Sequence, residues 1–376
     1  MNIKSDVVVV GGGVHGCSVA LHLQRRGFKT CVIEKDYAGR HASGVNAGGV
    51  RTLGRHVAEL PLAIKAKELW RDMENFIGDD CGFRPVGQVR IAETDAELDL
   101  LRKRSSQVAA LGLPHAETVI GAEEVRDLLP EVSPACIGGL FVSGDGYANP
   151  FRTTNAMKHR AAELGANFTE GVEIVSVERS NSVWVLEARD GTSFEAPVLV
   201  NCAGAWGDRV AAIAGDQVPL SANGSMMMIT SRIPALIGPV VGAAGRALSL
   251  KQFENGTVLI GGGHRAPVNR DKNETTLDVS KLAEAASTVV ELFPVFRQVQ
   301  IVRFWSGIEG FTPDKLPVIG ASCNAPDCFH AFGFSAHGFQ LGPIVGQVVA
   351  DLIENGRTDL PIEAFSPYRF QHRVAA

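Results

Sequence analysis

A glycine-rich turn between a buried strand and a helix constrains this chain more than any other feature. The apolar run Val7–Val10 is β-branched and does not alternate with polar residues, which is typical of a strand buried on both faces of a parallel sheet. Residues 11–16 follow as GGGVHG, so Gly11, Gly13 and Gly16 match the G-x-G-x-x-G pattern. The first glycine allows a tight turn, the second lets the backbone approach a pyrophosphate, and the third lets the helix pack closely on the strand. The helix then directs unpaired N–H groups and its positive dipole end at the phosphates.

The next predicted strand supports the same interpretation. Val14, Cys17 and Leu21 share one face of the helix that follows the glycines. The strand over 30–33 then stops at Glu34, close to the ~20-residue distance at which dinucleotide folds place a carboxylate on a ribose hydroxyl. A glycine-rich turn in some other α/β protein is the weaker alternative. The sequence therefore predicts an adenine dinucleotide site.

Composition narrows the class of protein. The 376 residues are enough for two domains, and 45% of them are hydrophobic, as in a soluble protein with a large core. The net charge of -5, without a long basic run, gives no reason to expect nucleic-acid binding. The early first strand leaves no room for a leader peptide, and no apolar stretch reaches the ~18–20 residues that span a membrane, so we expect peripheral membrane contact at most. The seven cysteines form no C-x-x-C pair, so we expect a cytoplasmic protein without a metal site.

The rest of the chain alternates helical and strand-like segments. Patterns of apolar residues predict helices over 62–77, 94–111, 121–129, 150–165 and 280–292. Strands are expected at 83–92, 172–178, 182–188, 194–201, 226–230, 247–252 and 257–260. A last helix is expected to begin at Pro343, because a missing N–H does no harm at a helix start. This order of elements predicts an α/β fold, and we find no internal repeat.

A second buried strand far along the chain ends in small residues. The run 196–201 is followed by Cys202, Ala203 and Gly204, and such an edge lets the backbone touch a cofactor without obstruction by side chains. A plain strand-to-helix turn explains this segment equally well when it is taken alone. A nicotinamide domain is normally contiguous, however, so a dinucleotide site divided between distant segments favours a flavin.

A third segment, residues 332–343, carries several glycines directly before the last helix. Glycines permit a backbone loop close to a planar ligand, and the helix start supplies N–H donors and partial positive charge. This arrangement stabilises the negative charge that a reduced flavin carries near N1 and the C2 carbonyl. The alternative is an ordinary loop with His337 on the surface.

Taken together, these segments resemble the D-amino-acid-oxidase superfamily of FAD-dependent amine oxidoreductases. The resemblance covers the whole chain, and the loop 43–51 is most similar to that of opine and hydroxyproline dehydrogenase β subunits and D-amino-acid dehydrogenases. It implies a discontinuous Rossmann-like FAD-binding domain and an α+β substrate-binding domain with a mixed or antiparallel sheet. The FAD-binding domain is expected over 1–82, 145–215 and 311–376, and the substrate-binding domain over 83–144 and 216–310.

The resemblance also implies which residues contact FAD. Glu34 would hold the adenosine ribose and Val172 the adenine end, while 42–51 lie against the flavin ring and pyrophosphate and 337–342 cradle the pyrimidine side. The expected cofactor-binding residues are Gly11, Gly13, Val14, His15, Gly16, Glu34, Lys35, Ser43, Asn46, Ala47, Gly48, Val172, Ala203, Gly204, Trp206, Gly338, Phe339, Gln340 and Leu341. Some relatives attach flavin through a cysteine within the stretch that corresponds to 304–311, which has none here. We therefore expect non-covalent FAD, with His41 as an outside candidate for a covalent link.

Oxidation of an amine beside a carboxylate requires a neutral nitrogen, an anchor for the carboxylate and exclusion of water. Arg51 and Arg55 are candidates for the anchor, and Trp305 and Glu309 for side chains that face the flavin ring. His337 is the best titratable candidate near the flavin, although it could equally well only orient its loop. We therefore take His337, Arg51, Glu309 and Trp305 as the candidate catalytic set and assign no general base, since a substrate can bind deprotonated.

Three functions fit this sequence. The first is an FAD enzyme that dehydrogenates a small amino or imino acid, D-hydroxyproline-like or opine-like, and passes electrons to a partner or carrier. The second is an oxygen-using oxidase of glycine, sarcosine or a D-amino acid that releases hydrogen peroxide. The third is a non-catalytic flavin-binding subunit. Because the related β subunits work with electron-relay subunits, in some cases through FMN at the interface, the resemblance implies a hetero-oligomer as one option.

Overall fold

The glycine turn follows the central strand of a six-stranded sheet. In this computed structural model, which describes residues 2–371, β2 (Val7–Val10) pairs in parallel with its neighbours on both sides. The order along the sheet is β22 (Val318–Ala321), β23 (Cys328–Phe332), β13 (Val198–Asn201), β2, β3 (Thr30–Glu34) and β9 (Asn167–Glu170). β22 alone is antiparallel to its neighbour within this sheet. The strand that precedes the glycine turn therefore lies between β3, which is near it in the sequence, and β13, which is far from it.

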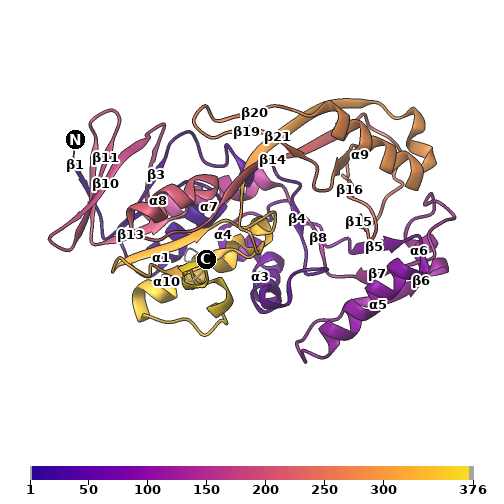
Figure 1. The fold of residues 1–376 in the computed structure, drawn as a ribbon, viewed down its shortest axis with the longest axis horizontal. Helices are drawn as coiled ribbons and strands as arrows, with labels where there is room; N and C mark the ends of the chain where they lie inside the picture. Colours follow the sequence, from indigo (N-terminus) through magenta and orange to yellow (C-terminus); the bar gives the residue numbers. More distant parts are fainter. Residues whose placement is uncertain (1, 372–376) are drawn as a thin grey trace.

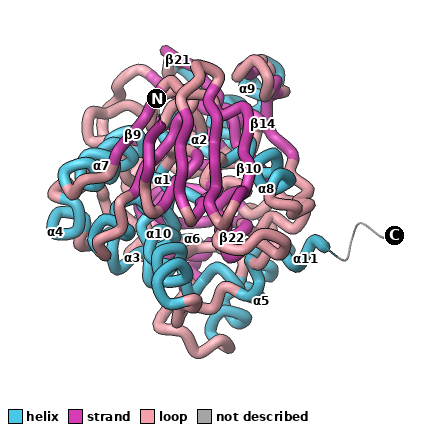
Figure 2. The backbone as a smooth tube through the Cα atoms, turned by 90° about the vertical axis from the view of Figure 1, so that its left-hand side faces the viewer, coloured by secondary structure: helices cyan, strands magenta, loops and turns pink. Residues whose placement is uncertain are grey.

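Successive residues of β2 face different layers, as the two-residue period of a strand requires. Val7 and Val9 pack against a helical layer, while Val8 packs against a smaller four-stranded sheet. The helices are α1 (Val14–Arg25), α7 (Pro150–Glu163) and α10 (Gly338–Asn355), which lie together in Figure 2. The smaller sheet has the order β1 (Asn2–Lys4), β12 (Ser193–Ala196), β11 (Val183–Ala188) and β10 (Ile174–Ser180). Burial on both faces explains why the valine run shows no polar alternation.

A nine-stranded sheet forms the other large layer. Its main path is β18 (Arg265–Ala266), β14 (Ser221–Thr230), β17 (Val258–Gly261), β16 (Ser249–Gln252), β15 (Val240–Ala243), β5 (Gln88–Ala92), β7 (Gly138–Val142) and β6 (Thr118–Gly121). The long strand β21 (Ile301–Phe311) pairs with β14. The sheet is mixed, because β15 and β5 are parallel. Helices α5 (Asp95–Ala109), α6 (Ala122–Leu128) and α9 (Val279–Leu292) pack on it, at the right of Figure 1.

Within the described chain, nine further helices and strands lie between these sheets and helices in the sequence or follow them. They are α2 (Ala42–Val45), α3 (Leu60–Arg71), α4 (Met73–Ile77), α8 (Gly207–Ile213), α11 (Tyr368–Gln371), β4 (Gly49–Val50), β8 (Gly146–Tyr147), β19 (Val268–Asn269) and β20 (Glu274–Thr275). None of the helices within residues 2–371 is long and apolar enough to cross a membrane. The predicted α/β class with a second, mixed sheet is confirmed. The strands of the six- and four-stranded sheets come from the segments expected to bind FAD, and those of the nine-stranded sheet from the other two. The residue boundaries of the two domains stay a prediction.

Two predicted elements are each divided in two. The helix expected over 62–77 is α3 and α4, because Asp72 has φ −118° and ψ 24°, outside the helical range. The strand expected over 194–201 is β12 and β13, which belong to different sheets and are separated by Pro197, a residue without an N–H for the ladder. The strand expected over 83–92 begins only at Gln88. The strand β21 has no counterpart in the prediction.

The prediction that the last helix begins at Pro343 is wrong. Helix α10 begins at Gly338, and Pro343 lies inside it, where it removes one backbone hydrogen bond. The carbonyl of Pro343 accepts hydrogen bonds from Ser18 Oγ at 3.2 Å and His22 Nε2 at 3.0 Å, both on α1. The two long helices are therefore joined at this point, and the earlier start of α10 carries its N-terminus to the site described next.

Candidate active site

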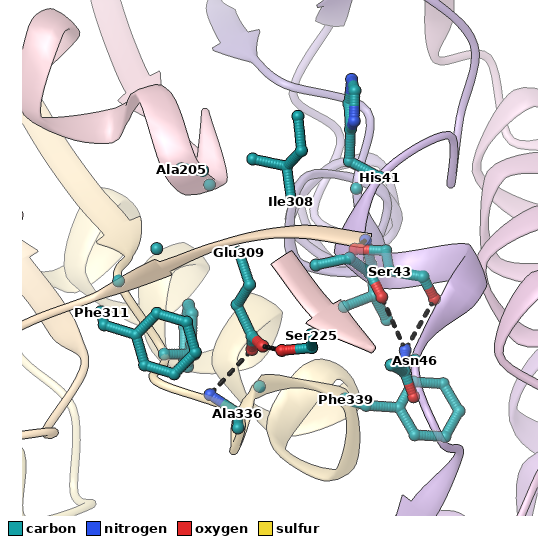
Figure 3. Close-up of a pocket in the computed structure, with 18 of the residues that line it drawn as sticks. His41, Ser43, Asn46, Ala205, Ser225, Ile308, Glu309, Phe311, Ala336 and Phe339 are labelled. Atoms are coloured by element: carbon teal, nitrogen blue, oxygen red, sulfur yellow. Dashed lines mark hydrogen bonds between the residues drawn. The ribbon is translucent and has the colours of Figure 1, made fainter. Parts of the chain in front are cut away.

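A cavity of about 980 Å³ is lined by residues of both large sheets. At one end lie the glycine turn and the ends of β2, β3 and β13. At the other end lie residues of β14, β15 and β21 from the nine-stranded sheet. The start of α10 and the loop around α2 also contribute to the wall, part of which Figure 3 shows. The cavity thus joins the predicted dinucleotide site to the predicted substrate side of the molecule.

Glycine is required at two positions of the turn. Gly11 has φ +107°, and a Cβ there would lie 2.3 Å from the carbonyl oxygen of Cys202, at the end of β13. A Cβ on Gly16 would lie 1.9 Å from the carbonyl oxygen of Gly11, so this residue lets α1 pack on the turn. Gly13 is the N-cap residue of α1, whose first turn contains no acidic side chain. The turn therefore has the close packing that the sequence pattern requires.

Glu34 organises the end of the cavity where the adenosine is expected. Its carboxylate oxygens accept hydrogen bonds from the backbone N–H groups of Gly12 at 2.7 Å and Asp36 at 2.9 Å. Burial raises the pKa of Glu34 despite these bonds. Each carboxylate oxygen keeps a further lone pair for a ribose hydroxyl. Lys35 Nζ lies 3.1 Å from the centre of the Trp206 ring. Two residues expected to contact the cofactor thus also contact each other.

The loop around α2 is held by its own hydrogen bonds. Ser43 Oγ accepts from the backbone N–H of Val14, at 2.9 Å, and Asn46 Nδ2 donates to the carbonyls of Ala42 and Ser43, as Figure 3 shows. Trp305 Nε1 donates to the carbonyl of Val45 at 2.8 Å. Trp305 does not line the cavity, so the expectation that it faces the flavin ring is not met. Its place in the structure is that of an anchor for the loop.

At the start of α10, His337 is held by two partners that precede it by many residues. Its Nδ1 lies 2.9 Å from Oε2 of Glu59, and its carbonyl accepts a hydrogen bond from Arg55 Nη1 at 2.8 Å. Burial lowers the pKa of His337 to about 4, against the effect of Glu59. Burial alone would raise the pKa of Glu59, but the hydrogen bond from His337 and the charge of Arg55 lower it below its ordinary value. At neutral pH the pair is therefore a neutral imidazole that donates Nδ1–H to a carboxylate, which leaves the lone pair on Nε2.

Glu309 projects from β21 into the cavity. Its Oε2 accepts a hydrogen bond from Ser225 Oγ at 2.9 Å, and its Oε1 accepts one from the backbone N–H of Ala336 at 2.7 Å. Figure 3 shows the carboxyl group between these two residues. Burial raises the pKa of Glu309 above its ordinary value. The side chain joins β14, β21 and the loop before α10, and its raised pKa makes it a better proton acceptor than an exposed carboxylate.

Most of the expected cofactor-binding residues line this cavity. They are Gly11, Gly13, Val14, His15, Glu34, Lys35, Ser43, Asn46, Ala47, Val172, Ala203, Gly204, Trp206, Gly338, Phe339 and Gln340. Gly16, Gly48 and Leu341 do not line it. Gly16 packs behind the turn, a Cβ on Gly48 would lie 2.2 Å from the carbonyl oxygen of Ala148, and Leu341 is wholly buried in the core. Of the expected catalytic residues, Arg51, Glu309 and His337 line the cavity.

Sequence reasoning missed several residues of the wall. Ser225 and Gln88 line the cavity, and Glu59 supports it through His337. Glu59 is 278 residues from His337, and no local pattern links them. The β-branched and aromatic residues within 301–311 were the available signal for β21, the strand that carries Glu309.

The wall fits a dinucleotide that ends in a planar ring. Two buried polar atoms of lining residues, His15 Nδ1 and Gln340 Oε1, have no hydrogen-bond partner among residues 2–371. Buried polar groups normally have partners, so both point to a polar ligand. The N-termini of α1 and α10, which both border the cavity, supply further N–H donors and partial positive charge.

The cavity between the glycine turn and the nine-stranded sheet is typical of a dinucleotide-binding protein built from two parts. A family model described as FAD dependent oxidoreductase (DAO) matches residues 6–352, and the chain belongs to this family. The resemblance inferred from the sequence is thus confirmed, and FAD is the cofactor of the family.

Individual relatives match along their whole length. Glycine oxidase of Geobacillus kaustophilus is 28% identical over 100% of this chain and 99% of its own. An opine oxidase subunit of Rhizobium meliloti is 25% identical over 98% of this chain and 99% of its own. The crystal structure of L-proline dehydrogenase from P. horikoshii superimposes with a TM-score of 0.92 at 28% identity, covering 99% of both chains.

Proposed function

We propose that this protein oxidises the C–N bond of a small amino or imino acid by hydride transfer to FAD. The observation that carries the proposal is the cavity itself, which connects the dinucleotide turn to the half-buried Glu309 side chain and the His337 imidazole. The names of the relatives support it, since glycine oxidase, opine oxidase and L-proline dehydrogenase all denote oxidation of amino-acid-like compounds. A D-hydroxyproline-like or opine-like substrate is the form of the proposal that we favour.

In this proposal the glycine turn and α1 hold the pyrophosphate of FAD, Glu34 holds the ribose, and the α2 loop and residues 338–340 hold the flavin ring. Bound FAD supplies the hydride acceptor. A non-covalent cofactor is favoured, because 304–311 contain no cysteine and His41 Nε2 is already paired with Asp36 Oδ2 at 2.9 Å. These groups position the ring against the side of the cavity that β14 and β21 form.

The protein's own residues prepare the substrate. Glu309, whose pKa is raised by burial, accepts a proton from the substrate ammonium group, and the neutral nitrogen then has a lone pair that assists as hydride departs. His337 presents a neutral imidazole, held in one tautomer by Glu59, and Arg51 offers a guanidinium for the carboxylate. The buried walls exclude water from the reacting carbon.

We infer that the electrons leave through a partner protein or carrier, with oxygen as the second candidate acceptor. The opine oxidase relative is named as a subunit, and therefore as one part of an assembly. This name supports a hetero-oligomer, for which FMN at an interface is one option. The full-length match to glycine oxidase favours oxygen. We place the protein in the cytoplasm, because the seven cysteines are all free and six of them are buried.

The test is anaerobic bleaching of the flavin absorbance by D-amino acids, hydroxyprolines, sarcosine and opines. Bleaching by one of these compounds supports the proposal, and no bleaching by any would favour a non-catalytic flavin subunit. The Glu309→Gln variant keeps the shape of the side chain but cannot accept a proton, so bleaching should slow about tenfold or more. Hydrogen peroxide released in air at the rate of bleaching would favour the oxidase.

A further inference from the structure

The cavity wall near Arg51 carries more positive charge than the protein neutralises. The three carboxylates that approach the loop after Arg51 are all buried, and each already has a cation within 4 Å. These pairs are Lys67–Asp145 at 2.8 Å, Arg104–Glu117 at 2.8 Å and Arg55–Glu59 at 3.8 Å. Anywhere in residues 2–371, neither Arg51 nor Arg90 has a carboxylate oxygen within 4 Å. Two guanidinium charges are therefore left over beside the cavity.

These two guanidinium groups lie on the same part of the cavity wall, one near the other. Both residues line the cavity, and a Cβ built on Gly54 would lie 3.5 Å from Arg90 Nη1 and 3.8 Å from Arg51 Nη1. Arg51 donates to the carbonyl of Leu53, and Arg90 Nε donates to the carbonyl of Ala243 at 3.1 Å. Because a guanidinium has five N–H donors, both groups keep several donors for a ligand. Such planar donor sets match carboxylate oxygens well.

A third polar group opens on the same part of the cavity. Gln88 precedes Arg90 by two residues on β5, so both side chains lie on one face of the strand and both line the cavity. Gln88 is only 9% exposed, and its Oε1 has no hydrogen-bond partner in the part of the chain that the structure describes. An unpaired buried amide beside two unpaired cations indicates a polar ligand, since such groups are normally satisfied.

We propose that Arg51 and Arg90 bind the two carboxylates of the substrate and select a dicarboxylic secondary amine over a monocarboxylic one. This inference rests on the proposed oxidation of an amino acid, whose substrate class it narrows. A monocarboxylate compensates one of the two guanidinium charges and leaves the other without a counter-ion at the cavity wall. A second carboxylate, on the other substituent of the nitrogen, neutralises both. Glu309 on β21 remains available for the ammonium group between them.

Thioethers test this proposal without any turnover. Thiodiacetate and (methylthio)acetate share a sulfur where the substrate has nitrogen, differ by one carboxylate, and offer no C–N bond to oxidise. Each is titrated into the FAD-loaded protein, and binding is followed by the change in flavin absorbance. We expect thiodiacetate to bind about tenfold more tightly or better, as for one added hydrogen-bonded charge pair. Equal affinities, or no binding of thiodiacetate, would overturn the proposal.

Variants identify the groups that cause the preference. Arg90→Gln should weaken thiodiacetate about tenfold while (methylthio)acetate changes little, and Arg90→Lys, which keeps the charge, should retain part of the preference. Arg297→Gln is the matched control, because Arg297 is exposed in η3 (Pro294–Gln298) and does not line the cavity. An unchanged preference in Arg90→Gln contradicts the proposal. If amino acids bleach the flavin but thiodiacetate binds no more tightly than (methylthio)acetate, only this inference fails. If thiodiacetate binds more tightly but no amine bleaches the flavin, the proposed reaction fails and the dicarboxylate site stands.

Discussion

His337 Nδ1 lies 2.9 Å from Oε2 of Glu59, a carboxylate without any exposed surface. The pair joins the N-terminus of α10 to η1 (Val57–Glu59), and the imidazole borders the cavity. The carboxylate fixes Nδ1 as the donor, so Nε2 carries the lone pair. The tautomer at the site is thus set by a residue that does not itself line the cavity.

Glu59→Gln tests this relationship. A glutamine amide can also donate to Nδ1, so the tautomer is no longer fixed, and the ionic component of the hydrogen bond is lost. We expect the rate of flavin reduction to fall about tenfold, with little change in FAD content, and the acid limb of its pH profile to move. Stopped-flow reduction between pH 5 and 9 measures both effects. A purely structural role for Glu59 predicts a lower melting temperature with an unmoved pH profile.

Stability should fall steeply in mild acid. Burial lowers the pKa of His15 to about 3 and the pKa values of His22 and His337 to about 4. The unfolded chain binds more protons than the folded one wherever the pH lies between these values and the ordinary 6.5, so stability is lost as pH falls through that window. Each of these histidines lowers the free energy of unfolding by about 1.4 kcal/mol at pH 5.5 relative to pH 7.5.

Urea unfolding at pH 7.5 and 5.5 measures this loss. His22→Gln removes one of these three imidazoles, whose Nε2 bonds the Pro343 carbonyl, and should reduce the difference in unfolding free energy between the two pH values by about a third. His56→Gln is the control, because His56 is exposed and does not line the cavity. An equal pH dependence in wild type and His22→Gln would show that acid acts elsewhere.

The local part of the site follows from sequence, because it depends on neighbouring residues. The valine run, the three glycines and Glu34 lie within one β–α–β unit, and their spacing alone predicts the turn that the structure contains. The pairing of β2 with β13 could be predicted only from the resemblance to a family whose cofactor site is divided between distant segments. The residues of the two strands do not themselves indicate that they pair in parallel.

The part of the site that β21 forms depends on contacts between residues far apart in the sequence. Local sequence patterns do not indicate these contacts. Trp305 and Glu309 lie four positions apart on β21, which would place them on the same face of a regular strand. The indole nevertheless bonds the Val45 carbonyl while the carboxyl enters the cavity. The partners on neighbouring segments, Val45 and Ser225, decide these roles, and the sequence does not indicate the pairing of β21 with β14.

Gly16→Ala should abolish cofactor binding. An added Cβ would lie 1.9 Å from the carbonyl oxygen of Gly11, which is backbone and cannot rotate away, so α1 must move from the turn. The purified variant should contain less than about a tenth of the wild-type FAD. Gly121→Ala is the matched control, because a Cβ there meets Glu124 Oε2 at an ordinary 3.7 Å and the site is remote from the cavity. Full FAD content in Gly16→Ala would contradict a tight turn at this position.

Lys251→Met should make the protein more stable and its cofactor less tightly held. Lys251 is 1% exposed, its Nζ donates to the carbonyl of Ala47, and no carboxylate oxygen of residues 2–371 lies within 4 Å of it. Burial lowers its pKa to about 7, so between pH 7 and 10.5 the unfolded chain binds more protons and stability rises with pH. Removing the amine should add up to about 3 kcal/mol at pH 7, after the loss of one hydrogen bond, and flatten the rise toward pH 9. The α2 loop loses a support, so FAD should bind about fivefold more weakly.

Lys67→Met is the contrasting variant: it leaves Asp145 buried without its cation and should destabilise the protein by about 3–5 kcal/mol. If both variants destabilise equally in urea, the Lys251 charge is compensated in the folded protein.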